Sequence, residues 1–450
     1  MKKRFRISMT PPQLILLGFA AVILLGSLLL ALPISTKSGQ AVSYTDALFT
    51  ATSATCVTGL VTLSTVATWS IFGQVIILLL IQIGGMGVIT VMAGIMLLLQ
   101  KRFGIKDRVL LQDSFNLNTL SGLVIFLRKV IAGTFIIESL GAVLYMTVFV
   151  PHFGVKGIWI SVFNSVSAFC NAGIDIISDY SLCDFAHNPV VNITTCLLIF
   201  MGGIGFIVWW DVLDAVKKQK AKWFKHLTLH SKIALSSSVF LILAGAVLIF
   251  VFEYNNPHTI KDFSLLDKIQ ASVFQSVTTR TAGFMTIPQQ NLTNPSSYVS
   301  LLLMFIGGSP AGTAGGIKTV TFTVLIASSI SAIKNRNETV LFNRSIPKLA
   351  VSKAVAVTSV SFATMFLSTI FLSIFVQADA LDIIFETISA TATVGLSRNL
   401  TSSLNEIGKI IIIITMYIGR VGPITLATML SLGKVKENII KNPVEDISIG

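Results

Sequence analysis

Charged residues are scarce in this chain of 450 residues. Lys, Arg, Asp and Glu together make up 12% of it, while hydrophobic residues make up 53% and the mean hydropathy is +0.82. So few charges cannot cover the surface of a soluble protein of this length. The composition therefore excludes an ordinary soluble domain and predicts a polytopic membrane protein, with the lipid bilayer as a partner.

Cysteine and histidine are also rare, with four and five copies. Their positions do not have the spacing of metal ligands or of a disulfide framework, so we expect neither a transition-metal site nor a disulfide. The sequence also shows no paired acids, histidine cluster or nucleophile near a membrane interface. A membrane enzyme would need one of these. We therefore expect no enzyme, no catalytic residue and no cofactor bound by this chain.

Basic residues outnumber acidic residues by 33 to 20, so the net charge is +13. The basic residues fall in alternate loops, which is typical of cytoplasmic loops rather than of a surface that binds nucleic acid. We expect no nucleic acid partner, a multi-pass protein of the plasma (inner) membrane with both termini cytoplasmic, and basic patches that contact lipid headgroups. The basic stretches are 2–6, 101–129, 217–232, 334–353 and 434–441.

Eight stretches are apolar enough to span a bilayer, and the first follows the basic N-terminus. A signal peptide has the same order of charged and apolar residues, but this apolar run is longer and takes the place of a first spanning helix. We expect an all-α membrane protein with eight transmembrane helices. The expected spans are 13–33, 71–99, 131–150, 190–210, 232–252, 296–306 continuing irregularly to about 330, 350–376 and 407–430.

A short segment of small and hydroxylated residues that ends in glycine occurs four times. Its glycines are 114, 110 and 112 residues apart, so the chain is a fourfold repeat. Each segment follows an amphipathic stretch too short to span a bilayer, which predicts a re-entrant pore helix between two spanning helices. These stretches carry Phe49, Phe163, Phe274 and Phe385. The expected organisation is repeat 1 at 1–103, repeat 2 at 104–218, repeat 3 with an intramembrane gating loop at 219–336, repeat 4 at 337–432 and a cytosolic tail at 433–450.

Four such segments around one axis can supply rings of backbone carbonyls that replace the water shell of a cation. Glycine suits a chain that turns at such an axis with positive φ. Glycine also marks tight helix packing in membranes, but four copies at a near-constant period favour an ion filter. The expected filter residues are Cys56, Val57, Thr58 and Gly59; Cys170, Asn171, Ala172 and Gly173; Arg280, Thr281, Ala282 and Gly283; and Ala392, Thr393, Val394 and Gly395.

A glycine pair follows each of the first three filter glycines by 24 to 29 residues. In the fourth unit Gly419-Arg420 stands at the equivalent place. All four are expected midway along the second spanning helix of their unit. In the third unit Pro310 and many glycines follow the pair, so the helix cannot continue. Irregular backbone at membrane depth must be buried or line a wet cavity, which favours a gating loop beneath the filter over a simple helix kink. The expected gating residues are Gly307, Gly308, Ser309, Pro310, Ala311, Gly312, Thr313, Ala314, Gly315, Gly316, Lys318 and Arg420.

Two charges lie at membrane depth. An unpaired guanidinium there costs at least ~2.5 to 3.5 kcal/mol, so Arg420 is expected to face the interior with the loop carbonyls as acceptors. Arg420 would then either hold the gating loop in place or form a cationic barrier to the permeating ion. The alternative is that it anchors one helix to another by hydrogen bonds. Glu138 is expected to cap a neighbouring backbone or pair with a polar residue. The loop is not a Walker A phosphate site, because Ile317 separates Gly316 from Lys318.

These features resemble the membrane subunit of the Ktr branch of the Trk/Ktr/HKT potassium transporters. The resemblance covers nearly the whole chain and rests on the filter segments, the glycine pairs, the run 307–319 and the final Tyr-Ile-Gly-Arg-Val-Gly-Pro at 417–423. It implies a homodimer with one pseudo-fourfold pore per subunit, and a cytosolic ring of nucleotide-binding regulatory proteins. In that family a serine in place of the first filter glycine accompanies sodium permeability. Gly59 therefore implies potassium as the permeant ion at the filter, with sodium left open as an activator.

The predicted function is potassium uptake across the plasma membrane through a channel-like, gated pore. A sodium- or proton-coupled potassium symporter is the alternative. A secondary transporter of organic solutes usually has two inverted halves rather than four parallel units, which argues against that class.

Overall fold

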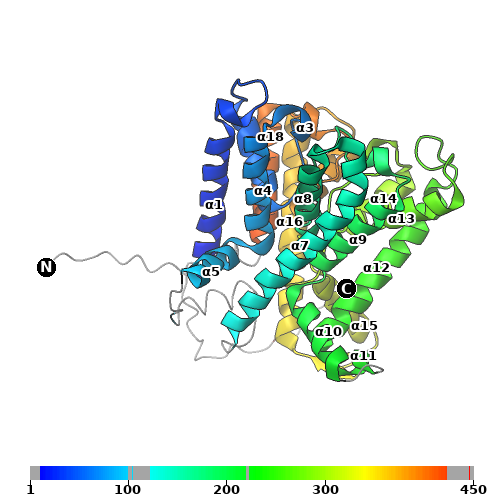
Figure 1. The fold of residues 1–450 in the computed structure, drawn as a ribbon. Helices are drawn as coiled ribbons and strands as arrows, with labels where there is room; N and C mark the ends of the chain where they lie inside the picture. Colours follow the sequence, from blue (N-terminus) through cyan, green and yellow to red (C-terminus); the bar gives the residue numbers. More distant parts are fainter. Residues whose placement is uncertain (1–10, 100–103, 105–121, 219–221, 423–444, 446–450) are drawn as a thin grey trace.

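The structure is a computed structural model that describes residues 11–99, 104, 122–218, 222–422 and 445. The expected basic N-terminus, the repeat boundaries at 103 and 432 and the tail 433–450 lie outside these ranges, apart from residue 445. The described chain is mostly helical and forms four successive units, each with a short helix between a preceding and a following helix (Figure 1). This is the predicted all-α architecture of four helix, pore-helix, helix units.

Each unit has three or four principal helices. In chain order they are α1 (Pro11–Leu30), α2 (Tyr44–Cys56) and α4 (Ile71–Met86); α7 (Leu123–Phe153), α8 (Lys156–Phe169) and α9 (Pro189–Gly203); α12 (Leu229–Glu253), α13 (Leu265–Thr278), α14 (Asn294–Phe305) and α15 (Thr319–Ile333); and α16 (Lys348–Phe375), α17 (Ala380–Ala392) and α18 (Glu406–Val421).

Smaller elements connect them. They are η1 (Pro33–Ser35), α3 (Thr65–Thr68), α5 (Val88–Leu98), η2 (Cys183–Phe185), α10 (Phe206–Lys218), α11 (Trp223–His226), η3 (Gln289–Asn291), the antiparallel pair β1 (Thr339–Leu341) and β2 (Arg344–Ile346), and η4 (Thr401–Ser403).

The short helices α2, α8, α13 and α17 form the centre of the molecule. Local sequence sets the starts of two of them, because the Ser43 and Ser264 hydroxyls accept from the N–H groups of Asp46 and Asp267 in the first turns of α2 and α13. Nearly every residue of the second halves of the four helices is buried. The four expected phenylalanines Phe49, Phe163, Phe274 and Phe385 are all buried.

The units close into a ring. The helix that follows each filter segment packs on the short helix of the next unit: α4 contacts α8, α9 contacts α13, α14 contacts α17, and α18 contacts α2. The same contact thus recurs four times, and the fourth joins the end of the chain to its beginning. Figure 1 shows the result, with α1 and α18 side by side although they lie at opposite ends of the described chain. The short helices are therefore arranged around one central axis.

The second helices do not run straight through the glycine pairs. The sequence predicted single spans over 71–99 and 190–210, but the chain bends by 99° between α4 and α5 and by 97° between α9 and α10. The bends occur at Gly87 and Gly205, whose φ values of 85° and 96° end an α-helix. Gly422 has a φ of 91° directly after α18. The glycine pairs therefore lie at helix ends rather than midway along helices.

Three described helices are long and apolar enough to cross a bilayer, namely 13–30, 229–253 and 348–375, and each bent pair adds one more. The remaining expected spans coincide with α7, with α14 followed by α15, and with α18. Part of the expected span 407–430 lies outside the described residues. The chain is accordingly a multi-pass membrane protein.

Candidate functional site

The four glycines of the predicted filter, called the filter glycines below, meet at the centre of the ring. All of them have positive φ: 98° at Gly59, 64° at Gly173, 83° at Gly283 and 96° at Gly395. An L-residue with a side chain rarely adopts this conformation. The backbone angle alone therefore favours glycine at these four places.

The glycines also contact one another too closely for a side chain. A Cβ atom built on Gly59 would lie 2.5 Å from the carbonyl oxygen of Ala172, and one on Gly173 would lie 2.5 Å from that of Ala282. One on Gly283 would lie 2.6 Å from the carbonyl oxygen of Val394. One on Gly395 meets the carbonyl oxygen of Thr58, which closes the circle. Each segment thus presents a backbone carbonyl to the glycine of its neighbour.

Hydroxyl groups at the end of each short helix hold the filter segments. The Ser53 and Ser389 oxygens each accept from the N–H of the filter glycine of the same unit, at 3.0 Å in both units. In the other two units Ser167 and Thr278 donate to the carbonyl oxygen directly after the glycine, at 2.5 and 2.6 Å. These four roles were not predicted from the sequence. The signal was present, because a hydroxyl residue opens each of the four repeated segments.

The residue two before each filter glycine also has positive φ. The four are Val57, Asn171, Thr281 and Thr393, with φ between 52° and 62°. Three of them are β-branched, for which this conformation is strained. The filter backbone therefore follows the same path in all four units, and strained residues lie directly beneath the glycines.

The residue three before each glycine differs between units. Arg280 is buried, and its guanidinium donates to the carbonyl of Ser238 at 3.0 Å and to that of Gly307 at 3.1 Å. Its side chain thus binds outside the filter, so only its backbone is available for the predicted ion-binding role. Cys170 lies 3.9 Å from a carboxyl oxygen of Glu138, and Gln82 donates to the other oxygen at 3.2 Å. Glu138 therefore pairs with polar side chains behind the second filter segment.

The glycine pairs pack against the ends of the short helices. A Cβ atom on Gly84, Gly202 or Gly419 would lie 1.9 to 2.2 Å from the carbonyl oxygens of Thr55, Phe169 and Thr391, respectively. Each of these carbonyls belongs to the residue four before a filter glycine. The missing side chain thus lets the second helix approach the base of the filter, and this explains three of the four pairs predicted from the sequence.

In the third unit the chain crosses beneath the filter as a non-helical loop. Residues 306–318, between α14 and α15, form this crossing loop. Its two ends pair, since the Gly307 N–H donates to the Ile317 carbonyl at 2.9 Å. Its middle binds the bend of the second unit, because the N–H groups of Ser309 and Thr313 donate to the carbonyls of Gly203 and Gly202 at 2.8 and 3.1 Å. The expected irregular loop is present at 307–316.

Two cations hold the carbonyls of the crossing loop. The Arg420 guanidinium donates to the carbonyl of Thr313 at 2.6 Å and also to that of Gly84 in the first unit. The Lys318 ammonium donates to the carbonyl of Ala314 at 2.6 Å. Both side chains thus place hydrogen-bond donors beneath the filter. The sequence predicted loop carbonyls as acceptors of Arg420, with an anchor between helices as the alternative, and Arg420 makes one bond of each kind.

A cavity of ≈ 270 Å³ opens on the other side of the filter, and all four filter glycines line it. Two carboxylates, Asp175 and Asp179, also line it, and no Lys or Arg side chain does so among the described residues. Burial raises the pKa of Asp175 to about 6, although bonds from Ser181 and from the N–H of Ile177 oppose the rise. This vestibule favours cations over anions. Neither carboxylate was predicted, although Asp175 lies only two residues after the filter glycine Gly173.

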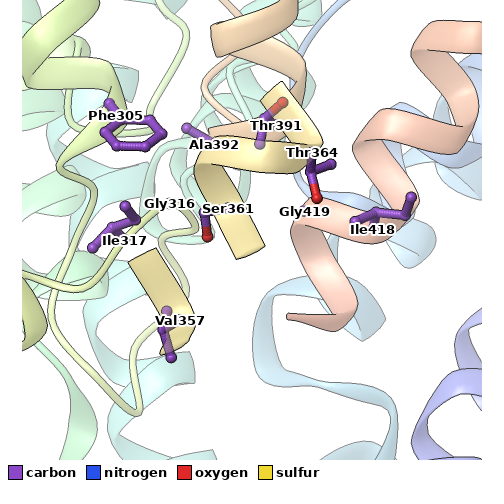
Figure 2. Close-up of a pocket in the computed structure, with 10 residues that line it drawn as sticks. All are labelled: Phe305, Gly316, Ile317, Val357, Ser361, Thr364, Thr391, Ala392, Ile418 and Gly419. Atoms are coloured by element: carbon purple, nitrogen blue, oxygen red, sulfur yellow. The ribbon is translucent and has the colours of Figure 1, made fainter. Parts of the chain in front are cut away.

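A second, small cavity lies beside the crossing loop, between the third and fourth units (Figure 2). Gly316 and Ile317 of the loop line one side, and Ser361 and Thr364 of α16 line another. Thr391 and Ala392, at the base of the fourth filter segment, also line it, together with Phe305, Val357, Ile418 and Gly419, as Figure 2 shows. The loop therefore has free space next to it within the membrane part of the molecule.

The fold and the site are those of a membrane transport protein in which four units surround one central ring of glycines. Comparison with known proteins agrees with this class. Residues 14–438 match the TrkH family, which is described as a cation transport protein. The Ktr system potassium uptake protein B of Bacillus subtilis is 40% identical over 442 residues, which are 98% of this chain and 97% of that protein.

The potassium/sodium uptake protein NtpJ of Enterococcus hirae is 37% identical and covers 100% of this chain and 99% of its own length. Among solved structures, the potassium transporter TrkH from Vibrio parahaemolyticus has a TM-score of 0.77, 16% identity, and coverage of 96% of this chain and 87% of that chain, which shows a shared fold. The chain belongs to the TrkH family of cation transport proteins. It is a transporter and not an enzyme.

Proposed function

We propose that this protein takes up potassium across the plasma membrane through the central filter. The observation that carries the proposal is the closed ring of four positive-φ glycines, each facing a backbone carbonyl of the next unit. Backbone carbonyls arranged around an axis can replace the hydration shell of a potassium ion. The relatives named for potassium uptake support the choice of ion. Sodium is proposed as an activator only, on the potassium/sodium name of the Enterococcus hirae relative.

Potassium flux tests this function. Expression in a cell that lacks potassium uptake should restore growth at low external potassium. Reversal potentials of the protein in a planar bilayer then separate the two candidate mechanisms. A pore follows the equilibrium potential of potassium, whereas a sodium- or proton-coupled symporter shifts with the gradient of the second ion. Failure of a well-expressed protein to restore growth, both alone and together with a candidate ring protein, would contradict potassium uptake itself.

We infer that the crossing loop is the gate of this pore. It lies beneath the filter, and three of its successive carbonyls are neighbours of Arg420 and Lys318. A cation that leaves the filter toward the cytoplasm would have to pass both positive charges. A cavity of ≈ 30 Å³ adjoins the loop at Gly316 and Ile317, so the loop is not tightly packed on that side. Opening then requires a ligand or partner that favours the displaced arrangement of the loop.

The proposed partner is a cytosolic, nucleotide-binding ring, and the proposed assembly is a homodimer with both termini cytoplasmic. The support is the gathering of basic residues in alternate connections, including the exposed Lys217, Lys218, Lys222 and Lys225 near α11. This pattern is typical of cytoplasmic loops. Purification of the chain from its native membrane, followed by mass measurement in detergent, tests both the dimer and the ring.

A further inference from the structure

The crossing loop is bonded to the filter itself as well as to the two cations. The Gly315 N–H donates to the hydroxyl oxygen of Thr281 at 3.1 Å. The Thr313 hydroxyl lies 2.9 Å from Oδ1 of Asn171 and 3.1 Å from the carbonyl oxygen of Phe169, and donates toward both. The side chains of Thr281, Thr313 and Asn171 are buried. Loop and filter are therefore joined in the second and third units by side chains.

These filter side chains belong to one ring position. Asn171 and Thr281 are each two before a filter glycine and have φ values of 60° and 62°. The equivalent residues of the other two units lack such a bond. Val57 has no polar side-chain atom, and the Thr393 hydroxyl has no hydrogen-bond partner within the described part of the chain although it touches Gly315. The position thus has two bonded and two unbonded members.

We propose that Asn171 and Thr281 are positioning residues that latch the crossing loop to the base of the filter in the non-conducting state. This rests on the proposed role of the loop as a gate. The bonded partners are a loop N–H and a loop hydroxyl, which lose these acceptors when the loop moves away. A buried N–H without a partner is costly, so the latch favours the closed loop. The latch also explains why a strained position carries bonded polar side chains in these two units.

The chain contains a matched pair of residues that tests the latch. Thr281→Val and Thr393→Val make the same chemical change at the same ring position, but only the first removes a bond to the loop. The full-length protein is placed in liposomes without any partner, and uptake of radioactive rubidium is measured. Thr281→Val should take up rubidium roughly 2- to 10-fold faster than Thr393→Val, which is the effect of one lost hydrogen bond on an equilibrium. Thr281→Ser, which keeps the oxygen, should remove most of this excess.

A third variant lacks residues 307–316 and separates failure of the latch from failure of the gate. If the deletion raises uptake but Thr281→Val equals Thr393→Val, the latch is wrong and the gate stands. If the deletion leaves uptake unchanged, both are wrong. Thr313→Val removes the loop partner of Asn171 and repeats the test from the loop side, should Thr281→Val not fold. The excess uptake of Thr281→Val should vanish when it is combined with the deletion, because the bond then has no loop to hold.

Discussion

At Gly59 the filter has no room for even one added carbon atom, the Cβ of a side chain. Its φ of 98° and the 2.5 Å between a built Cβ and the carbonyl oxygen of Ala172 leave no room for a side chain. Gly59→Ser should move that carbonyl, and the potassium-over-sodium preference should fall roughly 10-fold, equivalent to about 1.4 kcal/mol. Competition between the two ions during uptake measures the preference. An unchanged preference in a well-expressed variant would remove this segment from the filter.

Asp175 in the outer vestibule predicts a dependence on external pH. Its pKa is raised to about 6, so the carboxylate is charged at neutral pH and loses its charge as the external pH falls through about 6. Asp179, Cys183 and Tyr145 also lie near enough to interact with its charge. Potassium uptake at low external potassium should therefore weaken as the outside becomes acidic, because a neutral vestibule attracts fewer cations.

Asp175→Asn supplies the comparison for this pH effect. Its uptake should be low already at neutral pH and should change little as the external pH falls through the pKa of Asp175. The amide keeps the size of the side chain and removes only the charge. Equal pH profiles for the wild type and the variant would assign the effect to another group.

Some single-residue roles could be predicted and others could not. The need for glycine at 59, 173, 283 and 395 follows from repetition, because the four glycines end the same short segment in each of the four units. The direction of the Arg280 side chain does not follow, because its acceptors Ser238 and Gly307 lie in other segments. Sequence spacing identifies a shared position, but the partners of a side chain depend on packing between segments that are far apart in the chain.

At the scale of helices and loops, we predict that the crossing loop limits potassium flux. Deletion of residues 307–316 should raise potassium flux in liposomes, since the backbone beneath the filter is removed. Arg420→Ala should act in the same direction, by roughly 10-fold, because one charged hydrogen bond contributes about 1.5 kcal/mol or more. The two changes together should not add, as they act on one structural element. Arg420→Lys is the control, because it keeps the cation but not the two-pronged bonding to Thr313 and Gly84.

The outcome that contradicts this gate is specific. A deletion variant that reaches the membrane and purifies in detergent as the wild type does, yet conducts no faster, would show that the loop is not the barrier. Additive effects of the deletion and Arg420→Ala would show that the arginine acts elsewhere, for example as a helix anchor through Gly84.

The bends after the glycine pairs mark the limit of predicting elements from hydropathy. Residues 71–99 and 190–210 are continuous apolar runs, and hydropathy cannot distinguish a straight helix from two helices at a right angle. The turn depends on backbone angles at Gly87 and Gly205. The interruption at 307–316 was predictable because proline and many weak helix formers lie together there. A single glycine after a pair gives a weaker signal, and its effect appears only when the neighbouring short helix is in place.

The fourfold arrangement of the units could be predicted from the sequence, but the contacts of the crossing loop, which differ between units, could not. Four equal repeats require four equivalent contacts between units, and the contacts of α4, α9, α14 and α18 with the following short helices fulfil this. The crossing loop breaks the symmetry, since it bonds side chains of the second and third filter segments and touches Thr393 of the fourth. Only the three-dimensional structure shows which units a loop at the axis contacts.

The face that would receive a regulatory ring includes α11 and the β1–β2 hairpin. These two elements meet there, with the rings of Phe224 and Phe342 6.2 Å apart. The surrounding basic residues are exposed, and they come from the connections between units 2 and 3 and between units 3 and 4. One surface thus joins two connections that the proposed topology places in the cytoplasm. A ring seated on this surface could act on α15, which follows the crossing loop directly and packs on the hairpin.

Charge reversal tests this surface. Lys222→Glu, Lys225→Glu and Arg344→Glu together should abolish copurification of a soluble nucleotide-binding protein, because each reversal turns an attraction to an acidic partner into a repulsion. Lys156→Glu and Lys261→Glu are matched controls, since both lysines are exposed and lie at or near the starts of short helices on the opposite, proposed external side. The controls should copurify the partner as the wild type does. If the triple variant retains the partner, docking occurs elsewhere and these basic residues serve only to orient the chain in the membrane.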